Sequence, residues 1–453
     1  MNLSLFKKMP VRFKPGSRIN WSSLTLFTLI VMATAGILVL ESSAEDTPDS
    51  IKSREDQVPA VLSEDSRPSV TLPEMKGGTI YLIPSSGQSN SIGAGGGPPR
   101  STKPANGNLF AVQAGRKITR LSEPTVSAVE PLRKETHVTS MGVAFAAGAS
   151  SRPLRSVFVF SSHGIGGMQL SALRQGGDTG SYEDMLKTVS LVRDVARNAG
   201  SALIVPYVAF IHGEADAALG LAASYFENLA AYVADLNRDI PAITGQKEPV
   251  RLVISQVSGG FGYYALTGSW IQLWQIKQSQ WLMSRINRDV VLAGPTYQFP
   301  LEKGRTSLHY TAEGYEMLGG MMGKAMSYMS RTGRKWLPLS PKSVRQEEGK
   351  VVIAFHVPVR PLRWDAKMNA PDRGFELFDR RGRVKLQSIS LRQDAVVLGP
   401  ARPLRGRVRV RYGFRPYAGN PAGGGSLTDS DQTVSPHGFR MRNYCVLFQM
   451  KEK

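Results

Sequence analysis

Thr79-Ile80-Tyr81-Leu82-Ile83-Pro84 is an apolar run, and small residues connect it to the turn Gly87-Gln88-Ser89-Asn90. The run predicts a buried β-strand, because a short continuous apolar segment bounded by turn residues is typical of a strand covered on both faces. Ser89 is then expected at the end of this strand, in a glycine-containing turn whose backbone can approach another molecule closely. By itself the tetrapeptide is more typical of an ordinary turn.

Similar apolar runs alternate with helical patterns as far as residue 330. The strand candidates are Thr79–Ile83, Ser156–Phe160, Leu203–Ile211, Arg251–Gln256 and Val290–Ala293. The helix candidates are Asp184–Asn198, Ala222–Asn237, Ile271–Arg288 and Ala312–Ser330. This alternation predicts the α/β fold class, with a parallel sheet covered by helices on both sides. Ligands of such sheets bind at the carboxyl ends of the strands.

Residues 331–453 have a different texture, with short β-rich segments, frequent arginine and no long helical period. They predict a small, basic, antiparallel β domain. The segment Gly419–Asp431 is expected to be a flexible loop. Alternating arginines between Arg405 and Arg411 would place cations on one sheet face. An ordinary solvated surface is the simpler interpretation of that face.

The N-terminus bears on the compartment. Five cations between Lys7 and Arg18 precede an uncharged stretch from Ile19 to Leu40, and Ser42-Ser43-Ala44 follows. Residues 1–44 are therefore predicted to be a signal peptide or an N-terminal membrane anchor, and the two interpretations stand side by side. In both, the rest of the chain is exported to the periplasm, the cell surface or the medium. Residues 45–77, rich in Ser, Pro, Asp and Glu, predict a flexible linker.

The net charge of +20 is concentrated in the C-terminal region. Residues 331–453 hold 25 lysines and arginines against 10 acidic residues, a net charge of +15. Export argues against a nucleic acid partner, so an anionic polysaccharide, a cell-wall polymer or a membrane surface is the better match. The single cysteine, Cys445, excludes an intramolecular disulfide and a Cys-based zinc site. The remaining histidines show no metal-ligand spacing, and no cofactor is expected.

A serine nucleophile needs an adjacent base and donors aimed at the developing oxyanion. His309, just before a predicted helix, is the candidate base for Ser89. Gly164-Ile165-Gly166-Gly167 follows the second strand and can offer backbone amides. His212-Gly213-Glu214-Ala215-Asp216 follows the third strand and holds three ionisable groups. Each segment alone has an ordinary structural explanation, but all are expected at strand ends of one sheet.

These segments together resemble the SGNH hydrolase superfamily, and within it the sialate O-acetylesterase-like carbohydrate esterases. The resemblance covers about residues 78–330 and rests on Gly87–Asn90, Gly166-Gly167, His212–Asp216 and His309–Gly319. It implies a flavodoxin-like three-layer α/β/α fold and removal of O-acetyl groups from a glycan. It also implies that Ser89 and His309 are catalytic. The oxyanion or supporting residues would be Gln88, Asn90, Gly166, Gly167, His212, Glu214 and Asp216.

Two positions depart from the pattern of these esterases. Thr306 stands three residues before His309, where the family has an aspartate that orients the histidine. A hydroxyl can accept a hydrogen bond from imidazole but cannot stabilise imidazolium as a carboxylate does. Without this aspartate, the protein would use a Ser–His dyad, or another carboxylate would orient His309: Glu214, Asp216 or Glu302. His212 replaces a glutamine, and it is either an oxyanion donor or a spacer beside a backbone-only oxyanion hole.

The expected function is that of an exported serine esterase that deacetylates a carbohydrate. In that mechanism His309 deprotonates Ser89, which forms an acyl-enzyme that water hydrolyses. An O-acetyltransferase acting on an exported polysaccharide would use the same residues with a sugar hydroxyl as acceptor. A glycan-binding protein on a decayed hydrolase scaffold is the third interpretation, and it is favoured by Thr306 and by the basic C-terminal domain.

Overall fold

The computed structural model describes the greater part of the chain from residue 78 onwards. The described residues are 78–96, 109–112, 118–120, 156–257, 269–303, 308–417, 423–435 and 437–453. The predicted signal or anchor (1–44), the predicted linker (45–77) and Thr306 lie outside them. None of the helices in the described ranges is both long and apolar enough to cross a membrane. Residues Pro68–Lys453 form one compact unit.

A mixed eight-stranded sheet forms the centre of the N-terminal part of this unit, with the order β3-β2-β4-β1-β6-β7-β8 and with β5 also paired to β1. The pairings of β1 with β4 and β6, of β6 with β7, and of β7 with β8 are all parallel. The strands are β1 (Thr79–Gly87), β2 (Leu109–Val112), β3 (Ile118–Arg120), β4 (Ser156–Ser162), β5 (Ala202–Ile204), β6 (Tyr207–Ile211), β7 (Arg251–Gln256) and β8 (Val290–Pro295).

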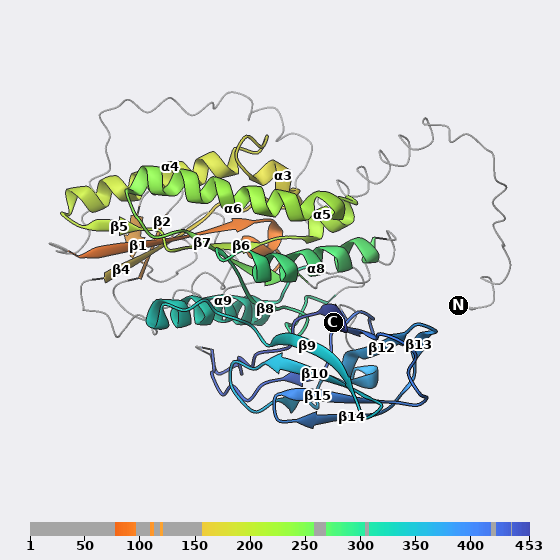
Figure 1. Cartoon of the computed structure of the whole chain (residues 1–453). Helices are drawn as coiled ribbons and strands as arrows, with labels where there is room; N and C mark the ends of the chain where they lie inside the picture. Colours follow the sequence, from red (N-terminus) through yellow and green to blue (C-terminus); the bar gives the residue numbers. More distant parts are fainter. Residues whose placement is uncertain are drawn as a thin grey trace, which may run out of the picture. The chain divides into compact units, whose positions relative to one another are not determined.

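Helices cover both faces of this sheet (Figure 1). Alternate strand residues such as Ile80 and Leu82 pack against α4 (Ser181–Asn198), α6 (Ala222–Thr244) and α8 (Trp270–Ile286). The intervening residues, among them Tyr81 and Ile83, pack against α9 (Ala312–Thr332) on the other face. The period of two along each strand therefore divides the core between two layers of helices. The predicted three-layer α/β/α class is confirmed.

Two features of the sheet differ from the predicted strands. The run Leu203–Ile211 is divided into β5 and β6 at Val205-Pro206, because proline has no backbone N–H to donate to a neighbouring strand. Strands β2 and β3 were not predicted. Both are short; β2 is parallel to β4, and β3, at the edge of the sheet, is antiparallel to β2.

The C-terminal part is built of antiparallel strands, as predicted. One four-stranded sheet has the order β14-β15-β10-β9, a second has the order β13-β12-β16-β18, and β11 pairs with β17. The strands are β9 (Ser340–Glu347), β10 (Lys350–His356), β11 (Arg363–Trp364), β12 (Phe375–Asp379), β13 (Gly382–Val384), β14 (Leu386–Arg392), β15 (Ala395–Pro400), β16 (Arg409–Tyr412), β17 (Leu427–Thr428) and β18 (Phe448–Lys451).

The expected flexible loop Gly419–Asp431 is wrong for its described part. Residues 423–431 are buried, and they include β17. A Cβ on Gly424 would lie 2.4 Å from the ring of Tyr297, and one on Gly425 would lie 2.6 Å from the ring of Tyr412. These glycines therefore permit close packing against aromatic side chains, where the sequence pattern suggested chain flexibility.

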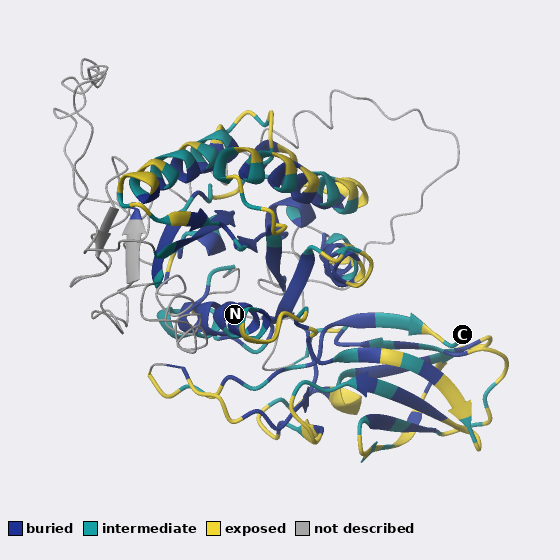
Figure 2. Ribbon diagram, turned by 60° about the vertical axis from the view of Figure 1, so that its left-hand side comes forward, coloured by how far each residue is buried: buried dark blue, intermediate teal, exposed yellow. Residues whose placement is uncertain are grey.

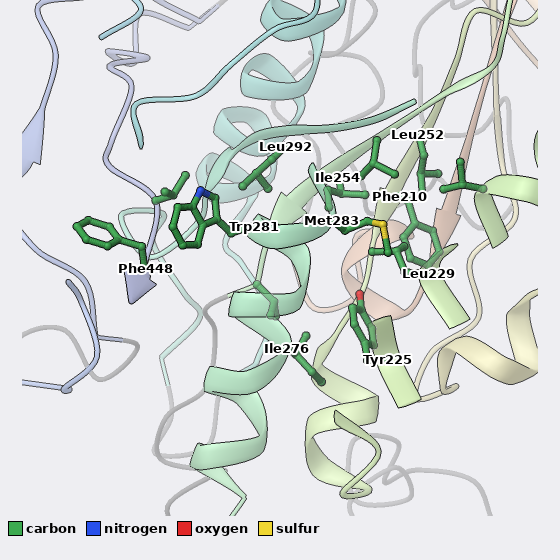
Figure 3. Packing of buried hydrophobic residues seen from close by; sticks show 14 of the residues in the cluster. Phe210, Tyr225, Leu229, Leu252, Ile254, Ile276, Trp281, Met283, Leu292 and Phe448 are labelled. Carbon is green, nitrogen blue, oxygen red and sulfur yellow. The ribbon is translucent and has the colours of Figure 1, made fainter. Parts of the chain in front are cut away.

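The β-rich part packs against α8, α9 and the ends of β7 and β8. Phe448 of β18 lies beside Trp281 of α8, with ring centroids 5.9 Å apart (Figure 3). The Gln256 side chain at the end of β7 donates to the carbonyl of Leu447 at 2.8 Å and accepts from its amide at 2.7 Å. Buried residues run through this contact, while exposed residues gather at the outer edges of the C-terminal strands (Figure 2). The boundary between domains at residue 330 stays a prediction.

Candidate active site

Ser89 lies at the carboxyl end of β1, in the short 3-10 helix η2 (Ser89–Ser91). The preceding Gly87 has φ +130°, and a Cβ there would lie 2.1 Å from the carbonyl oxygen of Ile211. Only glycine fits both this conformation and this close approach to β6. Gln88 then donates its amide to the same carbonyl at 3.1 Å. The turn is thereby fixed to the sheet, and Ser89 remains partly exposed.

Gln88 and Asn90 flank the serine and share one buried carboxylate. Glu214, in the short helix α5 (Glu214–Ala218), accepts from Gln88 Nε2 and from Asn90 Nδ2, each at 2.8 Å. The Gln88 oxygen accepts the amide of Ala215 at 2.9 Å. Burial raises the pKa of Glu214, and the charge of the buried Lys277 acts in the opposite direction. Glu214 therefore positions the residues on both sides of Ser89.

Asn90 also links the serine turn to the segment of His309. Its Nδ2 donates to the carbonyl of Leu308 at 3.1 Å, and its Oδ1 accepts from the hydroxyl of Tyr315 at 2.9 Å. Tyr315 lies in the first turns of α9, the helix that begins just after His309 and is capped by Thr311. Ser89 and His309, distant in sequence, are thus held at one edge of the sheet.

His309 is partly buried, and burial lowers the pKa of its imidazole. A lowered pKa keeps the ring neutral near pH 7, the state that a general base requires. A neutral ring is the state expected of His309 if it is the base for Ser89, as predicted from the sequence. The position that would hold the family's orienting aspartate, Thr306, is not among the described residues.

Glu302 is an acidic residue whose backbone is hydrogen-bonded to that of His309. Its amide donates to the carbonyl of His309 at 3.0 Å, and Leu301 and Tyr310 form a β-bridge. A Cβ built on Gly95 would lie 2.5 Å from Glu302 Oε2 and 3.1 Å from His309 Cβ. The carboxylate of Glu302 and the side chain of His309 therefore approach the same small residue from the same side.

The glycine loop after β4 reaches Ser89 from another direction. A Cβ on Gly166 would lie 3.8 Å from Ser89 Cβ, and both Gly166 and Gly167 are exposed. Gly167 has φ +73°, a conformation that glycine adopts without strain. Of the two glycines named from the sequence, Gly166 is thus the one placed next to the serine.

His212 and Asp216 hold the far end of this loop. Nε2 of His212 donates to the carbonyl of Met168 at 3.0 Å, and Asp216 Oδ2 accepts the amide of Leu170 at 2.9 Å. Both side chains are buried. Burial lowers the pKa of His212, against the opposing charge of Asp216. The Nε2 proton of His212 is therefore engaged with the loop backbone.

The start of the glycine loop is held by a group that the sequence did not single out as functional. Nε2 of His163 is hydrogen-bonded to Ser161 Oγ at 3.0 Å, and Nδ1 to Asp184 Oδ2 at 3.1 Å. These are the residue types of a catalytic triad, but Ser161 is only 1% exposed and cannot meet a substrate. The group instead braces the strand end from which Gly164–Gly167 departs.

Two observations concern other possible ligand sites in the described part of the molecule. It contains no group of three or more His, Cys, Asp or Glu side chains that could hold a metal ion. A cavity of about 750 Å³ lies beside the second half of α9, lined by Trp336, Lys324 and Met441 among others, and not at Ser89 or His309. The candidate active site is instead the open edge of the sheet around Ser89.

The parallel sheet with helices on both faces, and the serine turn at its carboxyl edge, define a hydrolase of the SGNH type. The model of the family described as carbohydrate esterase, sialic acid-specific acetylesterase, matches residues 78–328, and the chain belongs to this family. It is therefore a member of a family of carbohydrate acetylesterases, which hydrolyse ester bonds. A comparison with curated protein sequences found no significant match.

A solved structure supports the fold. XAC1771, described as a novel carbohydrate acetylesterase from Xanthomonas citri, is similar with 16% sequence identity and a TM-score of 0.54. The match covers 82% of this chain and 80% of that one. A protein from Arabidopsis thaliana matches with 18% identity and a TM-score of 0.43, over 55% of this chain and 98% of its own.

Proposed function

We propose that the protein is a serine esterase that removes O-acetyl groups from a carbohydrate through an acyl-enzyme on Ser89. The observation that carries this proposal is the link through Asn90, which connects the turn of Ser89 to the backbone beside His309 and to Tyr315. Gly166 lies on the other side of the serine, with a Cβ position 3.8 Å from Ser89 Cβ. The proposed nucleophile, base and amide donors thus lie at one edge of the sheet.

In the first half of the reaction, His309 accepts the hydroxyl proton of Ser89 as the serine oxygen attacks the acetyl carbonyl carbon. The amides of Ser89 and Gly166 stabilise the negative charge on the carbonyl oxygen. Collapse of the tetrahedral intermediate breaks the ester C–O bond, and His309 returns the proton to the departing sugar oxygen. In the second half, water attacks the acetyl-serine with His309 as base, and acetate leaves.

Glu302 is proposed to orient His309 in place of the missing aspartate. Of the three carboxylates that the sequence offers for this role, Glu214 accepts from Gln88 and Asn90, and Asp216 accepts from Leu170. Both are committed to bracing other segments. Glu302 pairs with His309 through the backbone, and its carboxylate approaches the same glycine as the histidine side chain. Its role is that of a positioning residue.

His212 is proposed to act through the loop backbone. Since its Nε2 proton goes to the carbonyl of Met168, the oxyanion donors are the amides alone. The protein is further proposed to act outside the cytoplasm, as the cationic flank and apolar stretch of residues 1–44 indicate.

Acetate release from an acetylated polysaccharide tests the proposal. The Ser89→Ala protein should release no acetate, while Ser224→Ala, a change at an exposed serine of α6, should match the wild type. Trapping acetyl-serine at residue 89 by mass spectrometry would identify the nucleophile. Transfer of acetyl to an added sugar in preference to water would make the protein a transferase. Equal inactivity of wild type and Ser89→Ala would contradict catalysis at this site.

A further inference from the structure

The sheet β13-β12-β16-β18 has one face in the core and one toward solvent. Val410 and Tyr412 of β16 are fully buried, so the alternating Arg409 and Arg411 point to the opposite face. Across the four strands, the register places one residue of each strand in a row with Arg409. Together with Arg411, this row forms what we call the cationic face: Arg383, Phe378, Arg409, Arg411 and Lys451.

Two arginines of this face, Arg409 and Arg411, have their guanidinium groups over aromatic rings. The guanidinium carbons of Arg409 and Arg411 lie 4.6 Å and 5.0 Å from the ring centre of Phe378, and that of Arg411 lies 4.4 Å from the ring of Phe414. Nε of Arg411 also donates to the side chain of Gln449 at 2.6 Å, which restrains this arginine further. A guanidinium placed over a ring can still use the Nη groups at its edge to bind a carboxylate. The donors are therefore oriented before any ligand arrives.

Positive charge on the face is not balanced within the described structure. Its one acidic neighbour, Glu376, already lies 3.4 Å from Arg383 and 2.7 Å from Arg415. Arg409 and Lys451 are directly opposite each other on β16 and β18, and neither forms an ion pair with a described residue. Like charges placed in this way destabilise a sheet. An anionic ligand would remove that repulsion.

Aromatic side chains connect the face to the active-site edge. Phe414 meets Trp270 and Trp274 edge-on, with ring centres 5.0 Å and 4.8 Å apart. Trp270 begins α8, the helix that follows β7, so it lies at the same carboxyl edge as Ser89. Trp270 and the neighbouring Ile271 are 36% and 42% exposed. Apolar and cationic groups thus continue from that edge onto the C-terminal sheet.

We propose that the cationic face binds an acidic polysaccharide, with sugar carboxylates on the guanidinium edges and sugar rings against Phe378, Phe414 and Trp270. A chain bound there extends toward Ser89 and presents its acetylated units at the edge of the parallel sheet. Binding to the face is independent of catalysis, and only the delivery to Ser89 rests on the proposed esterase function. The substrate class is then a glycan rich in uronic acids.

Binding is measured with the full-length Ser89→Ala protein, so that turnover does not interfere. The probes are polygalacturonate and its fully methyl-esterified form, which keeps the sugar backbone and removes the negative charge. Polygalacturonate should bind about ten-fold or more tightly than the neutral form, and added salt should weaken its binding. Equal affinity for the two polymers would overturn the proposal. Preference for anionic phospholipid vesicles over polygalacturonate would also overturn it and assign the face to a membrane.

Arg409→Gln with Arg411→Gln should lower the affinity for polygalacturonate by about ten-fold or more. The control is Arg197→Gln with Arg288→Gln, which removes the same charge from exposed helix-end and loop positions of the hydrolase part. Equal losses in the two double variants would show a non-specific charge effect and contradict the proposal. The Arg409→Lys, Arg411→Lys protein keeps the charge but loses the paired N–H donors of guanidinium. Its affinity should lie between those of the Ser89→Ala protein and the double glutamine variant. Circular dichroism confirms that each variant is folded.

Discussion

In the proposed mechanism, the protonation of His309 sets the pH range in which Ser89 is activated. Burial lowers the pKa of the imidazole below its ordinary value of 6.5, so a larger share of the protein holds a neutral base at slightly acidic pH. We expect kcat/KM for an aryl acetate to rise with pH along a single acid limb whose midpoint lies below 6.5. A midpoint above that value would mean that a carboxylate stabilises the imidazolium more than burial destabilises it.

Glu302 gives a second prediction at a single residue. Glu302→Gln should lower kcat by about 10²-fold or more with little change in KM, because an unoriented imidazole loses its alignment with Ser89. Since a nearby carboxylate stabilises imidazolium, the same change should move the acid limb to lower pH. Glu227→Gln, at an exposed position of α6, is the matched control and should change neither quantity.

A second substitution is expected to restore activity to the Glu302→Gln protein. Introducing Thr306→Asp into the Glu302→Gln protein puts a carboxylate where related esterases carry theirs, and we expect it to restore part of kcat. Thr306→Asp alone should keep or raise activity. If Glu302→Gln and Glu227→Gln behave alike, Glu302 does not position His309.

The sequence predicts a role for a residue only where that residue belongs to a recognised motif. Ser89, His309 and Gly166 were expected at one edge, and their strand-end positions follow from the alternation of elements. Gln88, Asn90 and Glu214 were expected as oxyanion or supporting residues, but the way in which Gln88 and Asn90 share the carboxylate of Glu214 is visible only in three dimensions. The brace at His163 was missed because its partners Ser161 and Asp184 form no known motif with it.

At the scale of elements, apolar pattern was a reliable guide wherever a strand is buried on both faces. The predicted Arg251–Gln256 matches β7 residue for residue, and α6 and α9 begin at the predicted Ala222 and Ala312. Strands β2 and β3 were not predicted, because segments of 4 and 3 residues are too short to show a period. The prediction for the glycine-rich segment before Asp431 was wrong, because its backbone packs against the rings of Tyr412 and of the sequence-distant Tyr297.

The row of like charges across β16 and β18 leads to a prediction on stability. Lys451→Glu places an acid opposite Arg409 and should raise the free energy of unfolding by about 0.5–1 kcal/mol. Lys453→Glu makes the same change in net charge outside the strand and should leave stability within about 0.5 kcal/mol. Urea denaturation of both variants decides the matter. A Lys451→Glu protein no more stable than the control would show that the cross-strand repulsion is screened by solvent.

At the scale of the whole molecule, α9 joins the active site to the C-terminal strands. Its first turns hold Tyr315 against Asn90, and the buried Glu316 accepts from the amide of His437 at 3.0 Å. Further along, the ammonium of Lys324 donates to Asp431 at 2.8 Å and to Met441 O at 2.7 Å. The helix that follows His309 is therefore held by residues near the C-terminal end of the chain.

Lys324 allows this coupling to be measured. Burial lowers the pKa of its ammonium, and the charge of Asp431 opposes that shift. Removing one partner of a buried ion pair leaves an uncompensated charge, so Lys324→Met should cost about 3–5 kcal/mol of unfolding free energy. Lys324→Met with Asp431→Asn should be less destabilised than the sum of the single variants, and chemical denaturation of the four proteins measures the difference. Acetate release by the folded Lys324→Met protein should fall only if the change shifts α9 at its His309 end. If the two changes in unfolding free energy simply add, the Lys324 ammonium and the Asp431 carboxylate do not interact. The C-terminal part would then not stabilise α9 through this ion pair.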